Sequence, residues 1–78
     1  MLRLNKPVRV TYDESVDAAY IYLCEVAPGA AVKTYCCDPN EVGAMINLDF
    51  NADGQLLGIE IIGAKGKLPA DLLKPEMT

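Results

Sequence analysis

The chain has no histidine and no tryptophan, and it has only three cysteines and one phenylalanine. Without histidine it lacks the side chain most often used for acid–base catalysis near neutral pH and for zinc ligation. The cysteines are odd in number, Cys36 and Cys37 are adjacent, no C-x-x-C spacing occurs, and no signal peptide precedes them. We therefore expect no disulfides, no structural metal, no cofactor, no catalytic residues, and a reducing, cytoplasmic setting.

Long apolar runs and an excess of basic residues are also missing. The longest apolar stretches, around residues 16–24 and 56–62, are broken by polar residues and fall short of the ~20 residues of a membrane-spanning helix. The net charge is −4 and the sequence pI is about 4.5. A protein that grips phosphate backbones needs an excess of Lys and Arg, so we expect neither a membrane nor a nucleic-acid partner.

The size of the chain limits the core that it can bury. Its 78 residues make one small domain, 1–78, and a chain of this length buries only ~60–65% of the surface that its unfolded form exposes. A hydrophobic content of 51% is enough to drive folding. Because disulfides and metals are not expected, self-association is the remaining source of burial, and we predict a homodimer.

Acidic residues concentrate in the middle of the chain. Residues 13–60 carry nine carboxylates against the single Lys33, a net charge of −8, whereas both ends are net positive. Turns and exposed strand positions favour Asp, Asn and Glu, which accounts for much of this bias. The bias also predicts an acidic turn face that suits a basic protein partner.

Period-two alternation and turn residues divide the chain into five strands and one helix. The strands are predicted over about residues 8–12, 18–24, 32–36, 43–50 and 55–62, and the helix over about 69–74. The second strand has apolar residues on both faces and is expected inside the sheet, whereas the shorter, more polar third strand suits an edge. The predicted fold class is α+β, a five-stranded, mainly antiparallel sheet with one short C-terminal helix.

The last two strands pair best in one register. A two-residue turn on Asp53-Gly54 makes every facing pair on one side apolar. These pairs are Ile46 with Ile61, Leu48 with Ile59, and Phe50 with Leu57. The other side is polar, with Asn47 across from Glu60, and with Asp49 across from Gly58, which relieves crowding. A G1 bulge in the loop would shift this register.

The same hairpin carries the pattern of a calcium loop. From Asp49 to Glu60 the chain fits D-x-[DN]-x-[DN]-G-x-x-x-x-x-E, the pattern of an EF-hand. An EF-hand needs a helix on each side, whereas both flanks here alternate as strands. In an extended strand Glu60 lies roughly 20 Å from Asp53 along the chain, too far to close around the same ion. We therefore predict no metal site.

An alternative hypothesis assigns the turn carboxylates to a weak divalent-metal or enzymatic site. Its residues would be Asp13, Asp17, Asp49, Asp53 and Glu60. The commoner role of Asp13 and Asp17 is to accept backbone N–H bonds and fix their own turn. No His, Ser–base pair or Gly-rich phosphate loop completes a catalytic set, so we expect no catalysis.

Cysteines and tyrosines offer two further candidate sites. Cys36 and Cys37 could form a redox pair, but small, partly buried apolar residues at the end of an edge strand are the commoner case, and Cys24 is expected in the core. The tyrosines could stack nucleobases, but without interleaved basic residues we expect a covered interface instead. They are Tyr12, Tyr20, Tyr22 and Tyr35.

Two sequence blocks resemble a known family. The first comprises Tyr12-Asp13, residues 17–21 and Leu23, the second comprises residues 46–54 and 57–62, and Leu68-Pro69 closes the pattern. Their order and spacing resemble the domain-of-unknown-function family 2283 over about residues 10–70, although the Cys36-Cys37 pair departs from that pattern. The resemblance implies a small, stand-alone, cytoplasmic bacterial or archaeal domain with no established activity. It also implies an alternative function, an antitoxin-like acidic partner of a basic toxin.

These features lead to one principal prediction. We expect a non-enzymatic, cytoplasmic, homodimeric protein-interaction module that is held together through its sheet and presents an acidic turn face to another protein.

Overall fold

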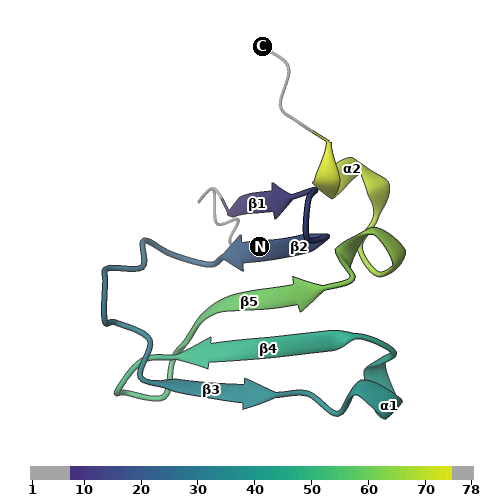
Figure 1. Cartoon of the computed structure of the whole chain (residues 1–78). Coiled ribbons are helices and arrows are strands. Elements are labelled where there is room, and N and C mark those ends of the chain that lie inside the picture. Colours follow the sequence, from purple (N-terminus) through teal and green to yellow (C-terminus); the bar gives the residue numbers. More distant parts are fainter. Residues whose placement is uncertain (1–7, 75–78) are drawn as a thin grey trace, which may run out of the picture.

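Five strands form one antiparallel sheet in the computed structural model, which describes residues 8–74 (Figure 1). The order across the sheet is β1-β2-β5-β4-β3, so β5 is central and β1 and β3 form the edges. The strands span Arg9–Asp13 (β1), Ala18–Tyr22 (β2), Lys33–Cys36 (β3), Met45–Phe50 (β4) and Leu56–Ile62 (β5). The predicted α+β class, with a five-stranded antiparallel sheet in a single compact domain, is confirmed.

Two strands are each two residues shorter than predicted, and β3 and β5 each begin one residue later. β2 ends at Tyr22 instead of residue 24, and beyond it the Leu23 amide makes one more bond to β5 by donating to the Leu57 carbonyl at 3.0 Å. β4 begins at Met45 instead of residue 43. Its start is delayed because a short helix occupies the preceding segment.

That helix, α1 (Pro39–Val42), lies between the predicted third and fourth strands, where no helix was predicted. The Asp38 side chain caps it by accepting the N–H of Asn40, and Pro39 supplies the φ angle that a first helical residue needs. Gly43 ends the helix in the left-handed region, with a φ of 78°. The single helical turn was therefore missed by the prediction, which gave one helix only, over 69–74.

The C-terminal segment forms a 3-10 turn and a short helix. The turn η1 (Ala64–Gly66) lies in the connection after β5, and α2 (Ala70–Leu73) follows it, slightly shorter than the helix predicted over 69–74. Pro69 precedes the first helical turn as its N-cap residue. A helix this short has little stability of its own, so its position depends on packing against the sheet.

The β4–β5 hairpin has the predicted ladder but a different turn. Asn51 and Gln55 close a three-residue loop, in which Gly54 has a φ of 79° and the Asn51 side chain accepts the N–H groups of Asp53 and Gln55. This loop is one residue longer than the predicted two-residue turn. The register shift falls between Asp49 and Phe50, so Phe50 faces Leu56 instead of Leu57.

A β-bulge at Leu57 compensates for the extra residue in the loop, so that the strand pairing beyond it is the predicted one. Beyond the bulge the predicted register is found: Leu48 faces Ile59, Ile46 faces Ile61, and on the polar side Asn47 faces Glu60 and Asp49 faces Gly58. The apolar pairing thus prevails over the turn, because slipping the ladder by one residue would turn its apolar side chains to the other face.

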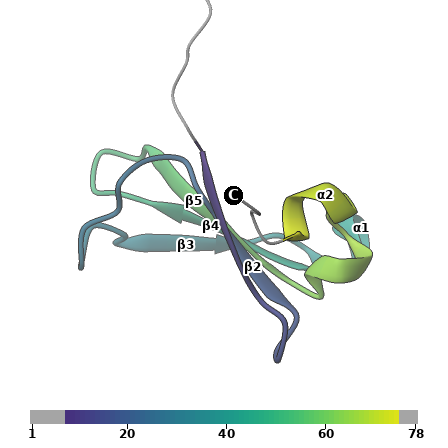
Figure 2. The same cartoon turned by 90° about the horizontal axis from the view of Figure 1, so that it is seen from above.

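The two faces of the sheet are covered unequally (Figure 2). The segment with η1 and α2 packs on one face, where Ala19, Ile61 and Ala64 are each at most 2% exposed and form the core. Half-buried apolar side chains, including Leu68 and Leu73, surround this core. On this face α2 contacts β1, whereas α1 contacts β4. Within residues 8–74, no helix combines the length and apolar character that a membrane crossing requires.

Candidate functional site

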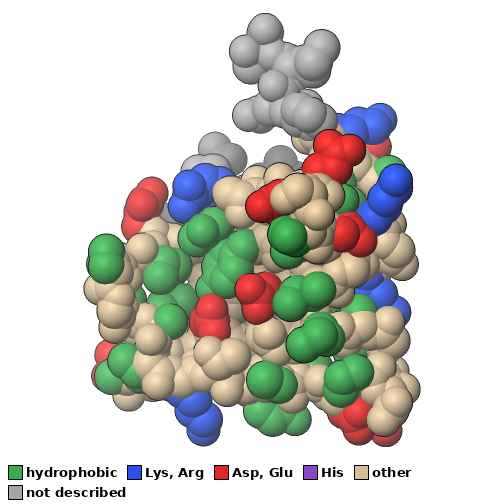
Figure 3. Space-filling model, viewed as in Figure 1, with side chains coloured by type: hydrophobic (Ala, Val, Ile, Leu, Met, Phe, Trp, Pro, Cys, Tyr) green, Lys and Arg blue, Asp and Glu red, His purple; other side chains and the backbone are tan. Residues whose placement is uncertain are grey.

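The sheet face opposite the helices is open and carries aromatic and polar side chains. The strand registers align one row of residues across all five strands, Arg9-Tyr22-Gly58-Asp49-Thr34, and beside it a second row, Thr11-Tyr20-Glu60-Asn47-Cys36. Figure 3 shows this surface, with acidic side chains among hydrophobic ones over the middle of the sheet. We call its central part the acidic sheet face, defined as Tyr20, Tyr22, Asn47, Asp49 and Glu60.

Asp49 is held from two sides. The Tyr20 hydroxyl donates a hydrogen bond to Oδ2 of Asp49 across β5, and the Thr34 hydroxyl donates to Oδ1 from β3, both at 2.6 Å. Gly58 leaves the space that the Tyr20 ring needs, because a Cβ atom on Gly58 would lie 2.7 Å from the ring atom Cζ. The absence of a side chain on β5 therefore allows β2 and β3 to contact the same carboxylate.

The environment of Tyr20 keeps its hydroxyl protonated. Burial raises the pKa of Tyr20 above its usual value, and the hydrogen bond to Asp49 and the negative charge of that carboxylate raise it further. A tyrosine hydroxyl is a donor at neutral pH, and the raised pKa extends this to more alkaline pH, while the bond to the Asp49 carboxylate is assisted by charge.

Two more contacts organise the acidic sheet face. Nδ2 of Asn47 donates to Oε1 of Glu60 at 2.8 Å, which orients the second carboxylate. The Arg9 guanidinium lies 4.0 Å from the centre of the Tyr22 ring, and the ring centres of Tyr20 and Tyr22 are 4.6 Å apart. The two rings thus lie between a cation at the β1 edge and the carboxylates near the centre.

The carboxylates of the β1–β2 turn have a structural role. Asp13 accepts the N–H and the hydroxyl of Ser15 at 3.0 and 2.6 Å, and these bonds lower the pKa of Asp13. Asp17 has a positive φ of 52°, and its Oδ1 accepts the Tyr12 hydroxyl at 2.7 Å and the Lys65 N–H at 2.9 Å. The bond to Asp17 raises the pKa of Tyr12. Asp13 accepts a backbone N–H of its own turn as predicted, whereas the Asp17 carboxylate accepts the backbone N–H of Lys65 and so ties the turn to η1.

The five carboxylates of the alternative metal hypothesis lie in different parts of the sheet. Asp13 and Asp17 lie at the β1–β2 turn, Asp53 lies in the β4–β5 loop, and Asp49 and Glu60 lie on the sheet face. Among residues 8–74, no group of three or more Cys, Asp or Glu side chains is placed to hold a metal ion. The EF-hand pattern is flanked by β4 and β5 and not by helices.

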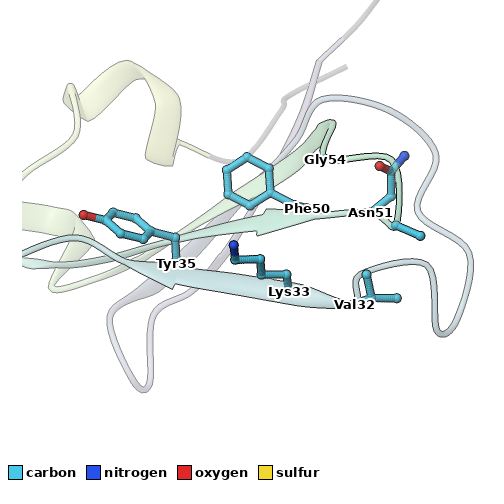
Figure 4. A pocket seen from close by; sticks show the side chains of 7 residues that line it. Val32, Lys33, Tyr35, Phe50, Asn51 and Gly54 are labelled. Carbon is cyan, nitrogen blue, oxygen red and sulfur yellow. The ribbon is translucent and has the colours of Figure 1, made fainter.

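A second open surface lies on the helix-covered face, beside β3. Figure 4 shows a hollow there, with Tyr35, Lys33 and Phe50 on the same side of the sheet as α2. The hollow has a volume of about 410 Å³ and is lined by Val32, Lys33, Tyr35, Phe50, Asn51, Ala52 and Gly54. Val32 and Tyr35 are 62% and 57% exposed, so apolar surface remains uncovered at this end of the sheet.

The cysteines and tyrosines are distributed differently from the predictions. Cys24, expected in the core, is exposed just beyond the end of β2, and Cys36 is exposed on the short edge strand, whereas Cys37 is half-buried. All three are free thiols. The tyrosines do not share one surface, since Tyr20 and Tyr22 lie on the acidic sheet face and Tyr12 and Tyr35 on the other side.

Two residues beside the acidic sheet face, Thr34 and Arg9, were not among the predicted site residues. Thr34 becomes relevant because β3 pairs with β4 in a register that sets it opposite Asp49. Arg9 becomes relevant because it faces Tyr22. A complete pairing of all five strands by their apolar pattern would have revealed both.

Comparisons with known proteins identify the family. The family model described as "Protein of unknown function (DUF2283)" matches residues 9–65. Searches of curated proteins and of solved structures found no match to this chain. The match covers both blocks on which the resemblance was based, and the chain belongs to the DUF2283 family.

Proposed function

We propose that this DUF2283 chain is a non-enzymatic, homodimeric protein-interaction module that presents its acidic sheet face to a basic protein. One observation carries the proposal: the buried core is small, and apolar and aromatic surface stays uncovered at the β3 end of the sheet, where all four β3 residues are exposed and a hollow is lined by Val32, Tyr35 and Phe50. Its three cysteines are free thiols, which supports a cytoplasmic setting.

The need for a second copy follows from the small core. Only Ala19, Leu57, Ile61 and Ala64 are buried among the apolar residues of the described chain, and two of these four are alanines. Burial of so little apolar surface contributes only a small favourable free energy against the conformational entropy that is lost on folding. A second copy that covers Tyr35 and its surroundings adds the missing burial in every molecule, without requiring another gene product.

The oligomeric state tests this part of the proposal. Light scattering coupled to size exclusion should give twice the 8.4 kDa chain mass. Tyr35→Lys should shift the protein to single chains, whereas Val16→Lys, at a residue 61% exposed on the distant β1–β2 turn, should leave the dimer intact. A single-chain mass for the unmodified protein up to its highest soluble concentration would refute the dimer.

The acidic sheet face supports a basic partner for three reasons. Asp49 and Glu60 are oriented by hydrogen bonds, so little side-chain entropy is lost when they bind a cation. Tyr20 and Tyr22 offer amphipathic rings of the kind enriched in protein interfaces. Arg9 on Tyr22 is an example, within the chain, of a guanidinium held by this surface.

An arginine-rich peptide is a suitable probe of this surface. In an NMR titration, the amide signals of β4 and β5 around Asp49 and Glu60 should shift, and the shifts should weaken with added salt. Asp49→Asn with Glu60→Gln should remove most of the binding. Glu14→Gln with Glu25→Gln removes the same charge from exposed positions off this surface and should have little effect. Equal losses in both double variants would show non-specific charge attraction and contradict the proposal.

A further inference from the structure

The open edge of β3 is built for pairing with another strand. All four residues of β3 are exposed, and β4 is its neighbour in the described sheet. Lys33 is the single charge on this strand, so the edge lacks the dense charge that often prevents strands from associating. An edge of this kind presents unpaired backbone groups to any extended segment of suitable shape.

The direction of those backbone groups follows from the β3–β4 pairing. The Cys37 N–H donates to the Ile46 carbonyl at 2.8 Å, so the groups of Cys37 point toward β4. Backbone groups alternate in direction along a strand, so those of Tyr35 also point toward β4. The N–H and C=O groups of Thr34 and Cys36 therefore point outward, to the open edge.

We infer that two copies of this chain join by antiparallel pairing of β3 with β3 about a two-fold axis at Tyr35, an inference that rests on the proposed homodimer. In this register Thr34 of each copy exchanges both backbone hydrogen bonds with Cys36 of the other. Tyr35 then faces its own copy as a close, non-hydrogen-bonded pair. The two sheets join into one sheet of ten strands, in which neither copy keeps an open β3 edge.

Side-chain chemistry favours this register and a second copy as the partner. The two Lys33 side chains do not face each other, because each lies opposite Cys37 of the other copy. The two Tyr35 rings face each other on the side of the hollows, and cross-strand aromatic pairs stabilise antiparallel sheets. The two-fold axis also gives the outward backbone N–H and C=O groups of Thr34 and Cys36 hydrogen-bond partners in both copies.

Disulfide trapping tests the register directly. In a background with Cys24, Cys36 and Cys37 replaced by Ser, Tyr35→Cys should give a covalent dimer under mild oxidation, because facing residues of a non-hydrogen-bonded pair are close enough for a disulfide. Lys33→Cys in the same background is the matched control. Its two copies would be separated by roughly 13 Å along the strands and should not cross-link. Faster cross-linking of Lys33→Cys than of Tyr35→Cys would overturn the register.

Cys36→Pro tests the backbone bonds in the chain with its other cysteines intact. Proline removes an outward N–H, which β4 does not use, and should weaken the dimer roughly tenfold or more, since the symmetry doubles each lost bond. Cys36→Ser keeps the N–H and should dimerise normally. Circular dichroism and thermal melting establish that both variants fold. A dimer that persists in Cys36→Pro without trapping at Tyr35→Cys would overturn this interface but keep the homodimer, whereas a monomeric unmodified chain would overturn both.

Discussion

The hydroxyl of Tyr20 on β2 and the carboxylate of Asp49 on β4 are joined by a 2.6 Å hydrogen bond that passes over the intervening strand β5. The two strands are not neighbours. The Tyr20 side chain can reach Asp49 because Gly58 on β5 has no side chain in its path. Thr34 extends the contact to β3. Together these two bonds fix the position of the Asp49 carboxylate on the acidic sheet face.

Gly58→Ala should destabilise the protein by about 1–3 kcal/mol, because the new methyl group would overlap the Tyr20 ring. Urea unfolding measures the loss. Gly66→Ala is the matched control, since a Cβ there meets nothing within 4 Å. Combining Gly58→Ala with Tyr20→Ala should cost less than the sum of the single changes. Strict additivity would contradict the proposed overlap.

Tyr20→Phe should cost about 1.5 kcal/mol of unfolding free energy, the lower end of the range for a bond to a charged group, because the site is half-buried. Asp49→Asn should have a similar effect. A double-mutant cycle between the two residues isolates the bond, and its coupling energy should be favourable. A coupling energy of zero would show that the two side chains act independently.

The stabilisation from Tyr20 should disappear at alkaline pH. Its pKa is raised in the folded state, so its contribution is complete below the unfolded pKa of about 10 and is lost as the pH rises toward the folded value. The difference in unfolding free energy between the unmodified protein and Tyr20→Phe should therefore shrink above this pH. A difference that stays constant into strong alkali would contradict the assignment.

Asp17→Ala should destabilise the chain by about 1–2 kcal/mol, because it removes the side-chain bonds to Tyr12 and Lys65 and places alanine at a positive φ. Asp17→Asn keeps an acceptor and tolerates this backbone conformation, so its effect should be small. Hydrogen exchange should show the loss of protection at Lys65 in the alanine variant. Equal protection in both variants would exclude the proposed link between the turn and η1.

The strands were predictable because period-two alternation is a local property of the sequence. In the hairpin, the facing pairs of Leu48 with Ile59 and Ile46 with Ile61 followed from the same pattern. The loop was not predictable in this way, because a three-residue turn with a left-handed Gly54 and a bulge at Leu57 gives the same ladder as a two-residue turn without a bulge.

The acidic sheet face was only partly predictable. Its polar hairpin side was expected from Asn47, Asp49 and Glu60, but the bond from Tyr20 requires β2 to lie beside β5, and the bond from Thr34 requires β3 to lie beside β4. The composition of the turns predicted an acidic turn face. In the structure, Asp13 accepts a hydrogen bond within the β1–β2 turn, and Asp17 accepts one from η1.

The sequence by itself determined the five strands, the antiparallel α+β class and the apolar pairing of the last hairpin, because alternation and turn residues act over a few neighbouring positions. The strand order, the meeting of Tyr20 with Asp49 above Gly58, and the open edge at β3 were decided by the tertiary structure. These features join residues far apart in the chain, and pairing between distant strands depends on the packing of the whole sheet rather than on any local pattern.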